Sequence, residues 1–152
     1  MITIKPHHFL DVIKLYGKGV EKFVPDRSYH HNFYSVANDL VNNHGTIIQL
    51  TSGKDDICGP CIYINEEGIC TDDIEHVAGV NSKDEWNKTL DHRIMRYTKV
   101  LEKSLLTAFE YCEILYFEKE HIFDVWKEES ESSKQIRYDT FCIGAKKYLK
   151  LR

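Results

Sequence analysis

The chain opens with two hydrophobic patterns of different period. Residues 2–5 (ITIK) alternate branched apolar and polar side chains, which predicts a short strand. Residues 6–17 place apolar side chains at helical spacing, with Pro6 in the first turn and Gly17 as the stop signal. We therefore expect a strand that leads directly into a helix.

A second amphipathic pattern covers residues 26–44. Its apolar side chains form one stripe at helical spacing, and either Asp26 or Ser28 is suited to cap the helix. Gly45 supplies the stop signal. Residues 46–53 (TIIQLTSG) then predict a second strand.

The second half of the chain is mostly helical in pattern. Ser82 begins a capping-box sequence and predicts the start of a helix. Residues 100–127 predict a further helix or pair of helices, residues 128–134 an exposed loop, and residues 136–152 a last helix. The intervening residues 53–81 have no long periodic pattern.

Together these patterns predict an α+β fold, a mainly helical single domain over residues 1–152 with a small two-stranded sheet and a cysteine-rich metal-binding loop. A length of 152 residues with 42% hydrophobic content suits one domain with a core. The 20 Lys+Arg and 24 Asp+Glu residues are scattered and give a net charge of -4, so we expect neither nucleic acid nor a membrane as partner. The start has no apolar run that suits a signal peptide or a membrane span, and we therefore expect a cytoplasmic protein.

Cys58-Gly-Pro-Cys61 has the spacing of a thioredoxin dithiol. Five cysteines, an odd number in a reducing compartment, argue against a disulfide framework and leave metal binding, redox chemistry or burial. Thioredoxin chemistry uses a long helix directly after a buried strand and a cis-proline later in the chain. Here a turn-rich stretch follows Cys61, and no proline lies beyond Pro60. A thiol-disulfide oxidoreductase using Cys58 and Cys61 is therefore the least favoured alternative.

A third cysteine favours metal binding. Cys58, Cys61 and Cys70 lie on one loop-rich stretch, and two residues between ligands is the spacing at which a turn aims both sulfurs at one metal. Three thiolates leave one ligand position to fill. The candidates for this position are Cys112, Cys142, His7 and His8.

These four candidates differ in their surroundings. Cys112 lies at helical spacing with core residues, which favours burial over ligation. Cys142 lies near the end of the chain, and ligation and plain burial are equally compatible with that position. His7 and His8 are adjacent on a helix and point about 100° apart, so at most one of them faces a given site. Capping or packing is the commoner use of such histidines.

The segments KPHHFLDVIKLYGKGV, SGKDDICGPC and GIC resemble a small bacterial and archaeal family, number 1284 among the domains of unknown function. The shared Pro-His-His, Gly-Lys-Gly and Asp-Asp-Ile-Cys elements fall in roughly the first 75 residues. That family is described as iron–sulfur binding, which the resemblance implies for Cys58, Cys61 and Cys70. Its members carry a cysteine where this chain has Asp11, and this difference shifts the missing ligand to Cys142 or a histidine.

We therefore expect a cysteine-ligated metal centre. The predicted cofactor ligands are Cys58, Cys61, Cys70 and Cys142, and the further candidates as metal ligands are His7 and His8. An iron–sulfur cluster, [4Fe–4S] in preference, is favoured over zinc because structural zinc sites usually present paired Cys-x2-Cys units. A structural zinc-binding interaction module is the alternative. The redox or protein partner is open, as is the choice between a structural, an electron-transferring and a catalytic centre.

Overall fold

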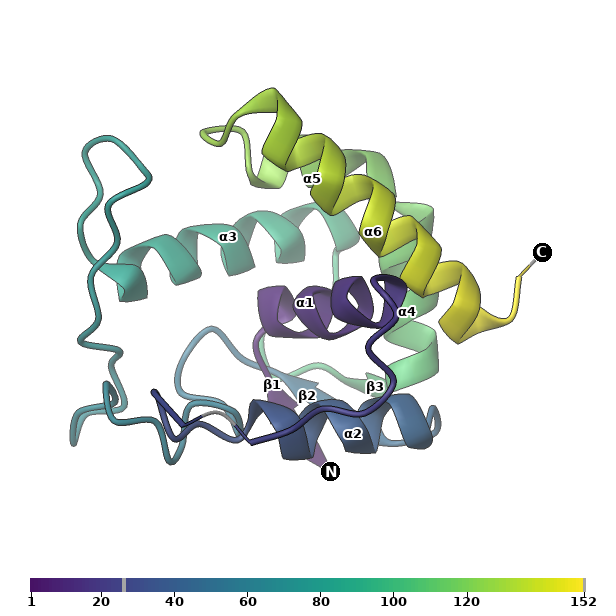
Figure 1. The fold of residues 1–152 in the computed structure, drawn as a ribbon, viewed down its shortest axis with the longest axis horizontal. Helices are drawn as coiled ribbons and strands as arrows, with labels where there is room; N and C mark the ends of the chain where they lie inside the picture. The colour runs from purple at the N-terminus through teal and green to yellow at the C-terminus, as the bar shows by residue number, and fades with distance from the viewer. Residues whose placement is uncertain (26, 152) are drawn as a thin grey trace.

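The structure is a computed structural model that describes residues 1–25 and 27–151 (Figure 1). Within these residues it has six α-helices, one short 3-10 helix and one three-stranded sheet. The predicted mainly helical fold with a small sheet is confirmed, but the sheet has three strands where the sequence predicts two. None of the helices in the described residues is both long and apolar enough to span a membrane.

The sheet has the strand order β1-β2-β3. Strands β1 (Ile2–Ile4) and β2 (Ile47–Leu50) are parallel, and β2 pairs antiparallel with β3 (Leu105–Thr107). The third strand lies inside the range that the sequence predicts as helical. A three-residue apolar run has too few positions to distinguish the strand period from the helix period, which is why β3 was missed.

Local signals set the start of two helices. Helix α1 (Pro6–Gly17) has the predicted bounds and carries its proline in the first turn. Helix α3 (Lys83–Thr98) is capped by Ser82, whose hydroxyl accepts a hydrogen bond from the backbone N–H of Glu85 at 3.3 Å. The remaining helices are α2 (Phe33–Asn42), α4 (Ala108–Phe117), η1 (Lys119–His121), α5 (Ile122–Val125) and α6 (Glu131–Leu149).

Helix α2 begins later than predicted. Its N-terminal cap is Asn32, not Ser28, and the other predicted cap, Asp26, lies outside the described residues. The residues before α2 instead bond to the cysteine segment: the backbone N–H of Asn32 donates to the carbonyl of Ile57 at 2.9 Å. These tertiary hydrogen bonds replace those that another helical turn would make.

Helix α6 begins earlier than predicted, because part of the expected loop 128–134 is its first turn. The hydroxyl of Ser130 accepts a hydrogen bond from the backbone N–H of Ser133 at 3.2 Å and caps the helix. The serine-rich stretch therefore marks a helix start and not only a loop.

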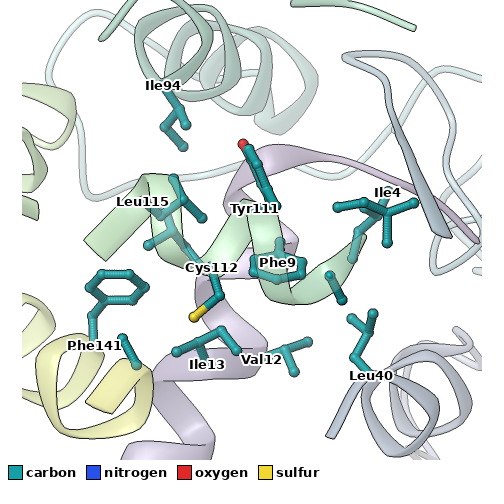
Figure 2. Packing of buried hydrophobic residues seen from close by; sticks show 14 of the residues in the cluster. Ile4, Phe9, Val12, Ile13, Leu40, Ile94, Tyr111, Cys112, Leu115 and Phe141 are labelled. Atoms are coloured by element: carbon teal, nitrogen blue, oxygen red, sulfur yellow. The ribbon is translucent and has the colours of Figure 1, made fainter. Parts of the chain in front are cut away.

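Helix α1 lies at the centre of the fold. It packs against α3 and α6, and in Figure 1 it lies between these helices and the sheet. Its residues Phe9, Val12 and Ile13 are fully buried, and Phe9 meets Tyr111 of α4 edge to face at 5.0 Å (Figure 2). The shared core fixes the start of α1, where the predicted site residues His7 and His8 lie.

Candidate metal centre

Consecutive turns shape the segment that carries the cysteines. The backbone N–H of Gly59 donates to the carbonyl of Asp55 at 3.1 Å, and the N–H of Cys61 donates to the carbonyl of Cys58 at 3.0 Å. A short hairpin follows, in which Ile64 pairs with Cys70. The turns and the hairpin bring Cys70 back toward Cys58 and Cys61.

Cys58, Cys61 and Cys70 line one cavity of about 120 Å³, together with His8 of α1 and Asn87 of α3. We call this the cysteine cavity. All five cysteines of the chain are free thiols in the structure. Three parts of the chain thus meet at this cavity: the segment between β2 and α3, the start of α1 and the first turns of α3. The meeting brings the three predicted cysteine ligands together with one of the two candidate histidines.

The most compact group of potential metal ligands in the described residues is His8, Asp55 and Cys58. Each of these residues has one potential ligand atom, and these three atoms all lie within 4.8 Å of one another. Cys61 and Cys70 stand outside this group although they line the same cavity. That the three cysteine sulfurs share one metal centre therefore stays a prediction.

A buried carboxylate, Asp55, connects the loop to α1. Its Oδ1 accepts from the backbone N–H groups of Ile57 at 3.1 Å and Cys58 at 3.0 Å, and its Oδ2 accepts from the backbone N–H of Lys5 at 2.8 Å. Burial alone would raise the pKa of Asp55, but His8 and the backbone donors outweigh it and hold the pKa well below its usual range. Asp55 is therefore a fixed negative charge beside the cysteine cavity.

The ring of His8 is oriented by the same carboxylate. Its Nδ1 lies 2.7 Å from Oδ2 of Asp55, so Nδ1 carries a proton and donates it. The other ring nitrogen, Nε2, has no hydrogen-bond partner within residues 1–25 and 27–151 and remains for a ligand. A carboxylate on one ring nitrogen and a metal on the other is the usual arrangement of a metal-ligating histidine.

His7 faces a different environment. It is 6% exposed, and its Nδ1 lies 2.8 Å from Oδ1 of Asp91 on α3. Burial would lower the pKa of His7, but the neighbouring Asp91 carboxylate outweighs this and raises it. Of the two histidines, only His8 lines the cysteine cavity.

Lys5, which lies between β1 and α1, is a site residue that sequence reasoning missed. It is 2% exposed, and its Nζ donates to Sγ of Cys58 at 3.5 Å. Burial disfavours its charge, but Cys58 and Asp55 outweigh burial and raise the pKa of Lys5. A lysine directly before Pro-His-His was a usable signal, because the residue that precedes helix α1 must lie beside the residues of its first turn.

The thiol of Cys58 does not have the properties of a redox-active dithiol. Burial first, and Asp55 second, raise the pKa of Cys58 to about 12. A reactive thiolate instead has a lowered pKa, commonly at a helix N-terminus, whereas Cys58 lies in a run of turns. Both observations weigh against disulfide exchange at Cys58 and Cys61.

The last two cysteines lie elsewhere. Cys112 is fully buried in the core on α4, as predicted (Figure 2). Cys142 lies half-buried on α6, with Tyr138 and Lys119 nearby. It does not line the cysteine cavity, so the structure does not bring Cys142 together with Cys58.

Because Cys112 and Cys142 have different surroundings, we expect their replacement by serine to affect stability differently. We expect Cys112→Ser to lower the free energy of unfolding by about 1–3 kcal/mol, because it replaces a fully buried apolar thiol with a more polar hydroxyl. Cys142→Ser should change it by no more than about 0.5 kcal/mol and leave bound metal unchanged. Urea denaturation and metal analysis of both variants measure this. Loss of metal in Cys142→Ser alone would restore this cysteine as a ligand.

Comparisons of the chain with protein-family models, with curated proteins and with solved structures gave no match.

Proposed function

We propose that the protein binds a metal centre in the cysteine cavity, with Cys58, Cys61 and Cys70 as thiolate ligands and His8 as the fourth ligand. The observation that carries the proposal is that these four side chains line one cavity while Asp55 holds the Nδ1 of His8. Three thiolates and one imidazole are a common donor set for a tetrahedral metal.

An iron–sulfur cluster, [4Fe–4S] in preference, is the first form of this proposal. It rests on the resemblance of the Pro-His-His and Asp-Asp-Ile-Cys segments to an iron–sulfur family. Lys5 supports it, because hydrogen bonds to ligand sulfurs are one means by which proteins set cluster potentials, and its Nζ lies 3.5 Å from Sγ of Cys58. Zinc is the second candidate, because the same donor set occurs in structural zinc sites of interaction modules.

An iron–sulfur cluster at this site would transfer electrons. A zinc ion would instead cross-link the cysteine loop. The chain's own residues hold the site. Asp55 orients His8 and ties the cysteine turn to the start of α1, and Lys5 would offset the negative charge of Cys58 as a thiolate ligand. Because the three cysteines are only half-buried, we further propose that a redox or protein partner in the cytoplasm approaches the centre from the loop side.

Metal analysis of protein purified without oxygen tests the proposal. A brown protein with a broad band near about 400 nm and about four irons and four sulfides per chain supports the cluster. One zinc per chain without sulfide supports the second candidate. Wild-type protein that holds neither metal in stoichiometric amount, even after reconstitution with iron and sulfide or with zinc, contradicts both forms.

Replacing the two adjacent histidines one at a time should separate their roles. We expect His8→Ala to lose most of the bound metal, because a ligand is removed and Asp55 loses its partner. His7→Ala should retain metal but lower the free energy of unfolding by about 3 kcal/mol, because the buried Asp91 carboxylate loses the imidazole and keeps only the backbone N–H of residue 7. Metal per chain and urea denaturation measure the two effects. Equal metal retention in both variants would remove His8 from the proposed ligands.

A further inference from the structure

We propose that the protein binds a small organic oxyanion in a second cavity, which adjoins the cysteine cavity. This cavity has a volume of about 310 Å³, within the range of small-molecule sites. We call it the tryptophan cavity, because both tryptophans of the chain, Trp86 on α3 and Trp126 after α5, line it. Its polar walls include His7, Asn87 and Arg137.

The walls of the tryptophan cavity carry hydrogen-bond donors that the protein itself does not use. Trp86 and Trp126 are 5% and 2% exposed, and neither indole N–H has an acceptor in residues 1–25 or 27–151. Neither nitrogen is among the fully enclosed side-chain atoms without a partner in that part of the chain, so each indole N–H keeps some accessible surface. Asn87 is 7% exposed, and its side-chain amide is likewise without a partner in that part of the chain.

Arg137 of α6 adds a cation to these donors. Its guanidinium stacks on the ring of Trp126 at 4.1 Å, and its Nη2 donates to Glu129 at 2.8 Å. The contact of its Nη1 with Asp11 is 3.8 Å, too long for a hydrogen bond. One side of the guanidinium thus remains for another acceptor.

The acidic groups of the tryptophan cavity do not oppose an anion strongly. Glu129 is already paired with Arg137 at 2.8 Å and lies 3.5 Å from His76, and Asp11 lies 3.4 Å from Lys14. The donors are therefore in excess over free acceptors. A carboxylate or a phosphate, which accepts several hydrogen bonds at once, is the chemistry that satisfies them.

The place of the tryptophan cavity gives the ligand a relation to the metal centre. His8, Lys83 and Asn87 line both cavities, so a bound oxyanion would lie next to the cysteine cavity. The ligand site does not depend on the proposed metal, because its unpartnered donors come from α3, α6 and the residues after α5.

Intrinsic fluorescence tests the ligand site directly, since both tryptophans of the chain line the cavity. The purified protein is titrated with inorganic phosphate, phenyl phosphate and benzoate, and calorimetry measures the same titrations. We expect a saturable fluorescence change with at least one probe. Phosphate-only and carboxylate-only responses distinguish the two oxyanions, and both support the site.

Variants decide whether the response comes from the tryptophan cavity. Arg137→Met and Asn87→Leu should each weaken binding at least about tenfold, because each removes a donor to a charged group. Arg93→Met is the matched control: Arg93 also contacts a tryptophan, at 6.0 Å from the ring of Trp86, but it does not line the cavity. Far-UV circular dichroism checks that each variant is folded. No saturable response to any probe, or equal weakening in the Arg93 control, overturns the proposal.

Discussion

Gly144→Ala should lower the free energy of unfolding by at least about 3 kcal/mol, although alanine is the better helix former. Gly144 lies in α6 where this helix crosses α1. A Cβ at this position would lie 1.9 Å from the carbonyl oxygen of Ile13 and 2.9 Å from the backbone nitrogen of Gly17. Both atoms belong to the backbone, so the added methyl group can be accommodated only if the two helices separate.

Urea denaturation of Gly144→Ala and Gly45→Ala measures this effect. Gly45→Ala is the control, because it also replaces a glycine with alanine. Its new Cβ would meet only a side-chain atom of Asn43 at 3.5 Å, which is an ordinary contact. We expect the control to change stability by no more than about 0.5 kcal/mol. Helix propensity alone predicts that Gly144→Ala is stabilising by about 1 kcal/mol. A stabilised variant would therefore show that α1 and α6 do not cross as closely as the structure has them.

Features of the fold that depend on neighbouring residues could be predicted from the sequence. Helix α1 combines an apolar stripe with Pro6 at its start, and the cap of α3 is a serine three residues before a glutamate. In both helices, the residues that predict the helix start are the same residues that form it. Sequence patterns of this kind are informative because the bonds they predict are local.

The features that were missed depend on distant partners. The start of α2 moved because residues 29 and 32 bond to the cysteine segment, with Ile62 donating to the carbonyl of Tyr29 at 2.9 Å. Strand β3 exists because β2 offers it an antiparallel edge. Neither partner can be read from the local pattern, since hydrogen bonds between remote segments override local preference.

The candidate site also contains some residues that the sequence predicted and others that it did not. The cysteine spacing predicted a shared place for Cys58, Cys61 and Cys70, and the structure has all three on one cavity. The expectation that at most one histidine of the pair faces this site follows from helix geometry. Asn87 could not be identified, because its importance arises from its place beside a segment about thirty residues away in the chain. For Lys5 the sequence offered only its position directly before Pro-His-His, and its partner Cys58 lies more than fifty residues away.

Asp55→Ala is the second substitution from which we expect a large effect, a loss of about 3–5 kcal/mol. The side chain of Asp55 is fully buried and joins the loop to β1 and α1. It accepts from the backbone N–H groups of Lys5, Ile57 and Cys58 and from Nδ1 of His8. Alanine leaves these four donors without an acceptor in a buried place, where each unmade hydrogen bond costs free energy.

The neighbouring carboxylate provides a matched control, because Asp56 also accepts from the backbone of β1, at 2.8 Å from the N–H of Thr3, yet is exposed. We expect Asp56→Ala to lose about 1 kcal/mol or less. Both variants are unfolded in urea with a chelator present, so that the difference reports the hydrogen bonds and not bound metal. Without chelator, Asp55→Ala should lose a further increment together with its metal, because His8 is no longer oriented. Equal losses in the two variants would mean that Asp55 does not join the loop to α1, and the proposed role of this carboxylate at the centre would then be wrong.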